Sequence, residues 1–322
     1  MNQFQITTEW DKVFEKSEKV DHKKVTFKNR YGILLVADLY KPKGVSEKLP
    51  AIACAGPFGA VKEQVSGLYA QTLAEMGFLT IAFDPSFTGE SAGQPRAMAS
   101  PDINTEDFQA AVDYLVTSPE VDGERVGICG ICGWGGMALN AASLDTRIKA
   151  TVTSTMYNMT RVTAKGYYDE ADNEQARYEM KVALNNQRTE DFKAGEYAKA
   201  GGVVKEITED MPQFVKDYHD FYIKDLGYHP RSVGSNDGWN VIGCMSFISQ
   251  PIIAYSDEIK TPVLMIHGEN AHSRYFSEDE FAKLKGDNKK LMIIPDANHT
   301  DLYYKTDIIP FEEIAEFFKE NL

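Results

Sequence analysis

Gly127-Ile128-Cys129-Gly130-Ile131-Cys132-Gly133-Trp134-Gly135-Gly136 is the stretch that decides the fold. Arg125-Val126 precedes it, and a helix-compatible run, Met137 to Ala142, follows. An apolar strand that runs into a glycine-flanked cysteine and then a helix is typical of the sharp turn that lifts a nucleophile above an α/β sheet. The usual form of that turn is Gly-x-nucleophile-x-Gly. Gly130 to Gly133 supply all of it except the last position, where Trp134 stands.

Short apolar runs alternate with helical patterns on both sides of this turn. Residues 25–40 predict a hairpin that turns at Asn29-Arg30-Tyr31-Gly32. Strands are predicted at residues 51–55, 78–83, 125–131, 148–153, 263–267 and 291–294. Nearly continuous apolar strands that alternate with helices indicate an α/β fold, with a mostly parallel central sheet flanked by helices.

The alternation breaks over residues 154–255, which are rich in charge, Tyr and Met. Helices are predicted there at about 173–192 and 208–226. We expect a helical cap inserted before the last two strands, because loops at this end of such a sheet surround the ligand crevice. The alternative is a solvated helical excursion without a catalytic part. The predicted organisation is 1–153 for the first part of the core, 154–255 for the cap and 256–322 for the last part of the core.

Composition restricts the classes of partner. The formal net charge of −14 argues against a nucleic acid or an anionic membrane surface. No segment reaches the roughly 20 continuous apolar residues of a membrane span. Four cysteines in 322 residues do not form a disulfide framework. With no export signal visible at the N-terminus, a cytoplasmic location is expected.

Cys132 is the predicted nucleophile, because Arg125 opens the strand seven positions earlier and a thiol ionises more easily than a hydroxyl. The exposed backbone amides and the dipole at the N-terminus of the following helix would favour the thiolate of Cys132. One alternative is that Cys132 is only a small buried hydrophobic residue without a catalytic role. A second shifts the register by two, puts Trp134 at the nucleophile position and leaves the protein catalytically silent. Redox or metal use of Cys129 and Cys132 is a third alternative, although no second cysteine pair has zinc-ligand spacing.

His299 is the predicted general base, since it lies just past the last strand, where the loop returns over the turn. The acid that orients it normally follows the penultimate strand, where Ala271 stands at the expected Asp position. Glu269 is the nearest carboxylate and is predicted to take this role; Asp301 and Glu63 are the other candidates. The amide of Gly133 and one from the loop 56–59, at Phe58 or Gly59, are predicted to form the oxyanion hole.

Several stretches together resemble the dienelactone-hydrolase-like branch of the α/β hydrolases, in particular the bacterial YcjY-type group. They run from residue 25 to the C-terminus and include Val61-Lys62-Glu63-Gln64, Phe83-Asp84-Pro85-Ser86, Gly130-Ile131-Cys132-Gly133, His229-Pro230-Arg231-Ser232 and His299-Thr300-Asp301-Leu302-Tyr303. The resemblance implies the α/β-hydrolase fold, the place of the cap and the roles of Cys132 and His299. Trp134 departs from the Gly-x-Cys-x-small turn of that branch.

His272 and Arg274, on the loop past the penultimate strand, are predicted pocket residues together with Trp134. A surface ion pair is the alternative for both His272 and Arg274. The sequence therefore predicts a hydrolase that cleaves a small-molecule ester, thioester or lactone through Cys132. No cofactor or metal is expected, and a homodimer through the cap or the sheet edge is plausible. The alternative is a catalytically silent ligand-binding protein with Trp134 in the nucleophile pocket.

Overall fold

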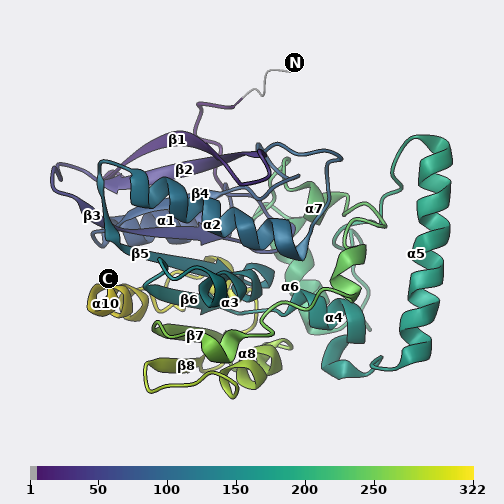
Figure 1. Ribbon diagram of the computed structural model, residues 1–322. Coiled ribbons are helices and arrows are strands. Elements are labelled where there is room, and N and C mark those ends of the chain that lie inside the picture. The colour runs from purple at the N-terminus through teal and green to yellow at the C-terminus, as the bar shows by residue number, and fades with distance from the viewer. Residues whose placement is uncertain (1–5) are drawn as a thin grey trace.

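An eight-stranded sheet forms the centre of the structure, a computed structural model that describes residues 6–322 (Figure 1). Its spatial order is β1-β2-β4-β3-β5-β6-β7-β8. The first two strands form an antiparallel hairpin, β2 also pairs antiparallel with β4, and all other neighbours are parallel. The strands are β1 (Val20–Lys28), β2 (Leu34–Pro42), β3 (Leu49–Ala55), β4 (Leu79–Phe83), β5 (Val121–Ile131), β6 (Ala150–Ser154), β7 (Val263–Gly268) and β8 (Lys289–Ile294). The predicted hairpin and all six predicted strands are confirmed.

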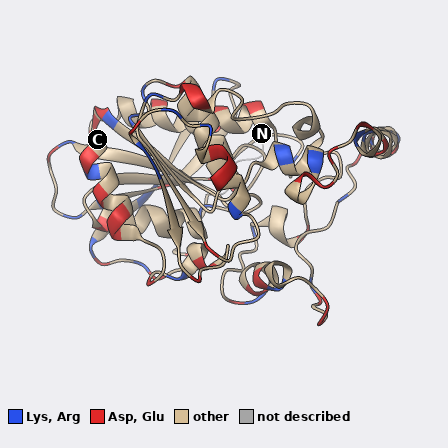
Figure 2. Cartoon of the chain, turned by 90° about the horizontal axis from the view of Figure 1, so that it is seen from below, with Lys and Arg blue, Asp and Glu red and all other residues tan. Residues whose placement is uncertain are grey.

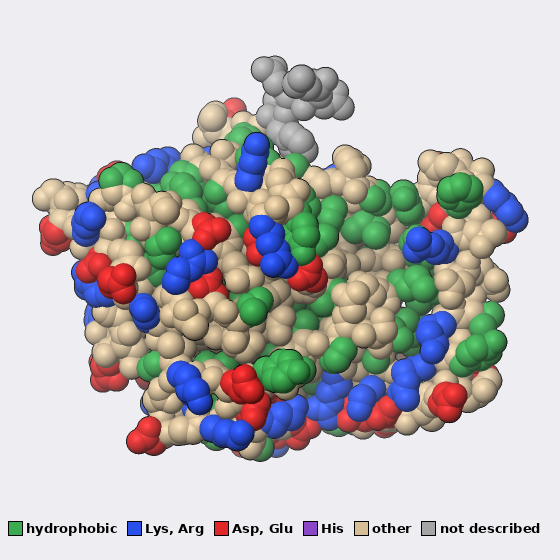
Figure 3. Space-filling model, viewed as in Figure 1, with side chains coloured by type: hydrophobic (Ala, Val, Ile, Leu, Met, Phe, Trp, Pro, Cys, Tyr) green, Lys and Arg blue, Asp and Glu red, His purple; other side chains and the backbone are tan. Residues whose placement is uncertain are grey.

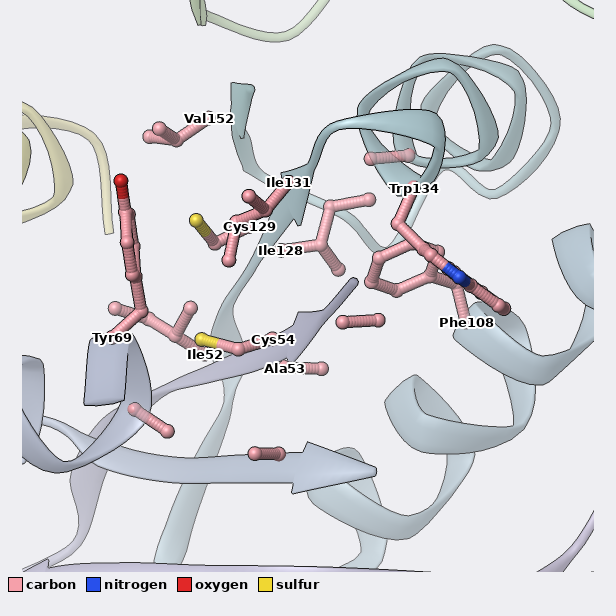
Figure 4. Packing of buried hydrophobic residues seen from close by; sticks show 14 of the residues in the cluster. Ile52, Ala53, Cys54, Tyr69, Phe108, Ile128, Cys129, Ile131, Trp134 and Val152 are labelled. Atoms are coloured by element: carbon pink, nitrogen blue, oxygen red, sulfur yellow. The ribbon is translucent and has the colours of Figure 1, made fainter. Parts of the chain in front are cut away.

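Helices cover both faces of this sheet. α1 (Val65–Glu75) packs with α10 (Phe311–Asn321), and α2 (Pro101–Thr117) packs with α3 (Gly133–Leu144). Because side chains alternate along a strand, Cys54 and Cys129 face Tyr69 of α1, whereas Ile128 faces Trp134 and Phe108 on the other side (Figure 4). The predicted α/β architecture with a mostly parallel sheet is therefore confirmed.

The segment between β6 and β7 is helical. It contains α4 (Met159–Lys165), η1 (Tyr167–Asp169), α5 (Glu174–Ala194), α6 (Gln213–Tyr222), α7 (Val233–Asn236), η2 (Met245–Ile248) and η3 (Ser256–Glu258). Both long helices predicted here are confirmed, as α5 and α6. In Figure 1 the helices of this segment gather at one end of the sheet, and α5 stands at the outer edge. The division into core and cap stays a prediction, but its first boundary falls where β6 ends, at Ser154.

Two short helices lie near the last strands and position the site. α8 (Arg274–Phe281) follows β7, and α9 (Asp301–Tyr304) follows β8. Acidic and basic residues are distributed over the helices and loops around the sheet (Figure 2). Among residues 6–322, no helix combines the length and apolar character that crossing a membrane requires.

Candidate active site

Cys132 occupies the sharp turn between β5 and α3. Its φ of +56° and ψ of −127° lie outside the regions that non-glycine residues normally adopt. Such a conformation costs about 1–3 kcal/mol and persists only where its surroundings hold it. Here the Cys132 amide donates to Ser154 O at 2.9 Å, and the Cys132 carbonyl accepts from Gly135 N at 2.8 Å and Tyr157 N at 2.9 Å. The backbone therefore presents this thiol, and not Trp134, at the tip of the turn.

Gly130 is required for the close packing of this turn. A Cβ added at Gly130 would lie 2.2 Å from the carbonyl oxygen of Trp134 and 2.7 Å from Cβ of Ala138, so any larger residue would push α3 away from β5. The first glycine of the predicted motif thus has a direct steric reason.

Trp134 points away from the site and into the hydrophobic core. Its ring packs edge-on against Phe83 at 5.7 Å and Phe108 at 5.5 Å between ring centroids (Figure 4). Gly56 makes room beside it, since a Cβ there would come within 2.9 Å of Trp134 Cβ. The prediction that Trp134 lines the substrate pocket is therefore wrong, and so is the shifted register, because Trp134 lies inside the first turn of α3.

Two backbone amides are directed at the Cys132 sulfur. Burial raises the pKa of the Cys132 thiol, whereas hydrogen bonds from the Tyr303 hydroxyl and from the amides of Phe58 and Gly133 oppose the increase. Phe58 and Gly133 are the two residues predicted for the oxyanion hole, and the structure brings both to the sulfur. The amides favour the thiolate as expected, but desolvation outweighs them.

His299 lies in the loop between β8 and α9, and it is buried. Its Nε2 atom is 2.9 Å from the Tyr303 hydroxyl. Its Nδ1 atom is 2.7 Å from Thr155 Oγ1 and 2.6 Å from Ser273 Oγ. Burial, followed by the neighbouring His272 and His267, holds the pKa of His299 well below its usual value. The imidazole is thus neutral near pH 7 and has hydroxyl partners on both sides.

The structure does not bring Glu269 to His299, which corrects the expectation for the orienting acid. Glu269 is exposed, and its Oε2 accepts a hydrogen bond from Asp296 N at 3.1 Å. Asp301 instead accepts from Asn298 N and pairs with Lys305. The physical reason is that the loop after β7 turns Glu269 outward and turns the hydroxyl of Ser273 inward.

Glu63, the third candidate acid, belongs to a separate buried cluster. Lys62 Nζ lies 2.6 Å from Glu63, 2.8 Å from Asp84 and 2.6 Å from Glu90. The three carboxylates are the only group among the described residues with metal-ligand spacing, and the Lys62 ammonium occupies its centre. Their attraction raises the pKa of Lys62 despite burial. Lys24 pairs with Glu90 and Arg231 pairs with Glu63, so three cations face the three carboxylates, and the hydrogen bonds of the His299 ring go to other groups.

The other predicted pocket residues have different positions. His272 stacks on Phe214 of α6 at 4.0 Å and hydrogen-bonds to the Tyr157 hydroxyl. Its ring also lies 5.5 Å from that of His299, so His272 belongs to the site. Arg274 does not, because its side chain bonds to Glu269 O at 2.9 Å and pairs with Glu278 at 3.1 Å, the surface ion pair foreseen as its alternative.

The sequence prediction missed the aromatic side chains that cover the site. Tyr157 and Tyr218 lie 5.2 Å and 5.5 Å from the His299 ring. Four further aromatic side chains lie near the rings of His272, His299 or Tyr303: Tyr167, Phe214, Tyr222 and Tyr303. Phe214, Tyr218 and Tyr222 are spaced four residues apart and therefore share one face of α6. That spacing in a predicted helix was the available signal.

Comparison with known proteins identifies the group to which this arrangement is similar. The sequence profile of the X-Pro dipeptidyl-peptidase (S15) family matches residues 31–301. An uncharacterized Pseudomonas aeruginosa protein, PA2218, is 56% identical over 99% of this chain and 86% of its own length, and its crystal structure superposes with a TM-score of 0.96 over 99% of both chains. The Escherichia coli protein YcjY is 33% identical over 93% of this chain and 99% of its own.

More distant proteins have named activities. The thiohydrolase AneE of Aspergillus aculeatus is 32% identical over 42% of each chain. The α/β hydrolase GrgF of Penicillium sp. sh18 superposes with a TM-score of 0.76 at 20% identity, over 94% of this chain and 99% of its own. The fold is therefore that of the α/β hydrolases.

Proposed function

Because this chain belongs to the X-Pro dipeptidyl-peptidase (S15) family of α/β hydrolases, we propose that it is a hydrolase of a small ester, thioester or lactone, with Cys132 as its nucleophile. One observation carries the proposal: Cys132 stands at a positive-φ turn with the amides of Phe58 and Gly133 directed at its sulfur. The thiohydrolase name of one relative agrees with thioester chemistry. The likeness to the dienelactone-hydrolase-like branch supports the choice of a cysteine.

In the proposed reaction the Cys132 thiolate attacks the acyl carbon. The carbonyl oxygen becomes an oxyanion, which the Phe58 and Gly133 amides stabilise. His299 takes the thiol proton and returns it to the leaving alcohol or thiol, and it then activates the water that releases the acyl group. Each step uses only groups of this chain, so the proposal needs no metal or cofactor. A cytoplasmic, reducing location suits a catalytic thiol.

The walls of the site favour an uncharged acyl group. Tyr157, Tyr218 and His272 surround the reacting atoms, and burial lowers the pKa of His272 to about 4, so this ring is also neutral near pH 7. A dipeptidyl-peptidase must hold the free ammonium of its substrate, for which a carboxylate is the natural partner. Glu269 and Asp301 are the carboxylates nearest in sequence to His272 and His299. Glu269 accepts a hydrogen bond from Asp296 N, and Asp301 pairs with Lys305. The proposal is therefore an acyl hydrolase of small molecules, not a peptidase.

Intact-mass analysis after incubation with a panel of nitrophenyl esters and acyl thioesters tests this function. We expect an acyl adduct on Cys132 that is absent from Cys132→Ala. Cys244→Ala is the matched control, because Cys244 is also unpaired and lies outside the site. The proposal is wrong if no ester or thioester is turned over or leaves an adduct, or if X-Pro nitroanilides are the preferred substrates.

A further inference from the structure

One nitrogen atom of His272 is buried in the site without a hydrogen-bond partner. This atom is Nδ1, and no partner for it is found among residues 6–322. The other buried side-chain atoms of this kind belong to residues outside the site, such as Thr151 and Asp191. An unpaired buried polar atom costs free energy, so most such atoms in folded proteins are paired, and each exception needs an explanation. A ligand that supplies the missing partner is such an explanation.

The His272 ring is held in place from several sides. Phe214 of α6 stacks on it, with 4.0 Å between the ring centroids and 17° between the ring planes. The Tyr157 hydroxyl is a hydrogen-bond partner of Nε2. The Tyr168 hydroxyl donates to the backbone carbonyl of His272 at 2.9 Å. These contacts fix the position of the unpaired Nδ1 atom.

The partners of Tyr157 indicate which nitrogen of His272 holds the hydrogen. The Tyr157 hydroxyl accepts from the Tyr218 hydroxyl at 3.4 Å and lies 3.2 Å from the Tyr167 hydroxyl. A phenol is a better donor than a neutral imidazole, and an imidazole nitrogen is a better acceptor than a phenol oxygen, so Tyr157 donates to Nε2. Burial lowers the pKa of His272 to about 4, and the neutral ring then carries its single hydrogen on Nδ1. The unpaired atom is therefore a donor.

His272 lies among the groups that surround the proposed reaction. Its ring centroid is 5.5 Å from that of His299, and the rings of Tyr157 and Tyr218 lie within 5.8 Å of both. These phenol rings are neutral near pH 7, so they would leave a charged carboxylate poorly solvated. An uncharged oxygen is the acceptor that suits such surroundings.

We propose that Nδ1 of His272 donates a hydrogen bond to a second, uncharged oxygen of the substrate, close to the reacting carbonyl, an inference that rests on the proposed function. The substrate class is then an oxygenated ester or thioester. The oxygen belongs either to the acyl group, as in a β-hydroxyacyl or β-oxoacyl compound, or to the leaving group.

A set of acyl thioesters tests this preference on the full-length protein. The butanoyl, β-hydroxybutanoyl and β-oxobutanoyl thioesters of ethanethiol differ only in the second oxygen of the acyl group. The butanoyl thioester of mercaptoethanol has the oxygen in the leaving group instead. We expect one of these two types to have a kcat/KM about tenfold higher than butanoyl ethanethiol, the effect of one neutral hydrogen bond. No preference for either type, or a preference for the charged succinyl thioester, would overturn the proposal.

Two variants separate Nδ1 from the rest of the His272 ring. The side-chain amide of Gln reaches the place of Nε2, whereas that of Asn reaches the place of Nδ1. His272→Gln should therefore lose the preference for the second oxygen, and His272→Asn should keep it. Because the measured quantity is the ratio of kcat/KM between two substrates, a general loss of activity cancels. A preference retained in His272→Gln, or lost equally in both variants, would refute the role of Nδ1.

Binding without catalysis separates this inference from the proposed function and needs no variant of His272. Butanamide, β-hydroxybutanamide and N-hydroxyethylbutanamide are titrated calorimetrically into Cys132→Ala, which lacks the proposed nucleophile. We expect one of the two oxygenated amides to bind about tenfold more tightly than butanamide. If it does so while the wild type cleaves no ester or thioester, the hydrolase is refuted and the recognition by His272 is retained. Equal affinities of the three amides would overturn the recognition itself, whether or not thioesters are cleaved.

Discussion

At His299, hydroxyl groups occupy the side of the ring where catalytic triads have a carboxylate. Ser273 Oγ lies 2.6 Å from Nδ1 of His299 and 2.9 Å from Nε2 of His267, whose Nδ1 continues to Ser277 at 2.7 Å. Burial lowers the pKa of His267 to about 3. A neutral chain of this kind orients the imidazole but does little to stabilise an imidazolium. A thiol suits such a site better than a serine hydroxyl, because it gives up its proton more easily.

Ser273→Asp tests this view by placing a carboxylate beside Nδ1 of His299. An adjacent negative charge raises the pKa of the imidazole. His299 is then protonated, and lost as a base, at a higher pH than in the wild type. The acidic limb of the pH profile of kcat/KM should therefore move to higher pH by about one to two pH units. Ser273→Asn is the control, because Asn has the shape of Asp without its charge, and it should leave the acidic limb at the wild-type pH. An equal shift in both variants would show that the charge at position 273 is not the cause.

At the scale of elements, the turn between β5 and α3 tolerates a tryptophan because the side chain leaves the turn on the core side. The Trp134 ring fills a space between Phe83 of β4 and Phe108 of α2. Glycines at positions 56 and 130 allow the backbones to approach this closely. Trp134 therefore joins the turn at Cys132 to the core packing between β4 and α2.

Trp134→Ser should accordingly lose stability and gain no activity. Removing a buried indole costs about 3–5 kcal/mol in the free energy of unfolding, which urea titration measures. Trp10→Ser, at a half-buried tryptophan near the edge of the sheet, should cost clearly less. A Trp134→Ser variant with wild-type stability and faster ester hydrolysis would instead support a tryptophan that blocks the site.

At the scale of the whole molecule, α5 stands apart from the body and carries exposed apolar side chains. Tyr178, Val182 and Phe192 are 59%, 42% and 90% exposed, although they lie at spacings that place them near one face of the helix. Hydrophobic side chains show along the α5 edge and in the hollow beside it (Figure 3). A cavity of about 800 Å³ lies between part of α5 and the residues Met98 and Ile242. Apolar side chains that gather on an exposed helix face are candidates for an interface.

We expect this surface to be covered by α5 of a second copy, which is the homodimer through the cap. Light scattering should then give about twice the chain mass of 36.0 kDa. A Tyr178→Glu and Phe192→Glu double variant should be monomeric, because the added charges would be buried at the interface. Leu144→Glu is the control, since Leu144 is 61% exposed at the end of α3, outside α5. A monomeric wild-type protein would exclude the dimer.

Local sequence patterns determined the order of strands and helices, the turn at Cys132 and the place of His299 after the last strand. These features depend on periodicity, on glycine and on chain order, all of which can be read along the chain. The tertiary structure alone decided where Trp134 points, that Ser273 and Thr155 replace a carboxylate at His299, and that the Tyr303 hydroxyl lies at Nε2 of His299. The reason is that hydrogen bonds and burial join residues far apart in sequence, and two side chains in one loop, such as Glu269 and Ser273, face opposite ways only once the loop has packed.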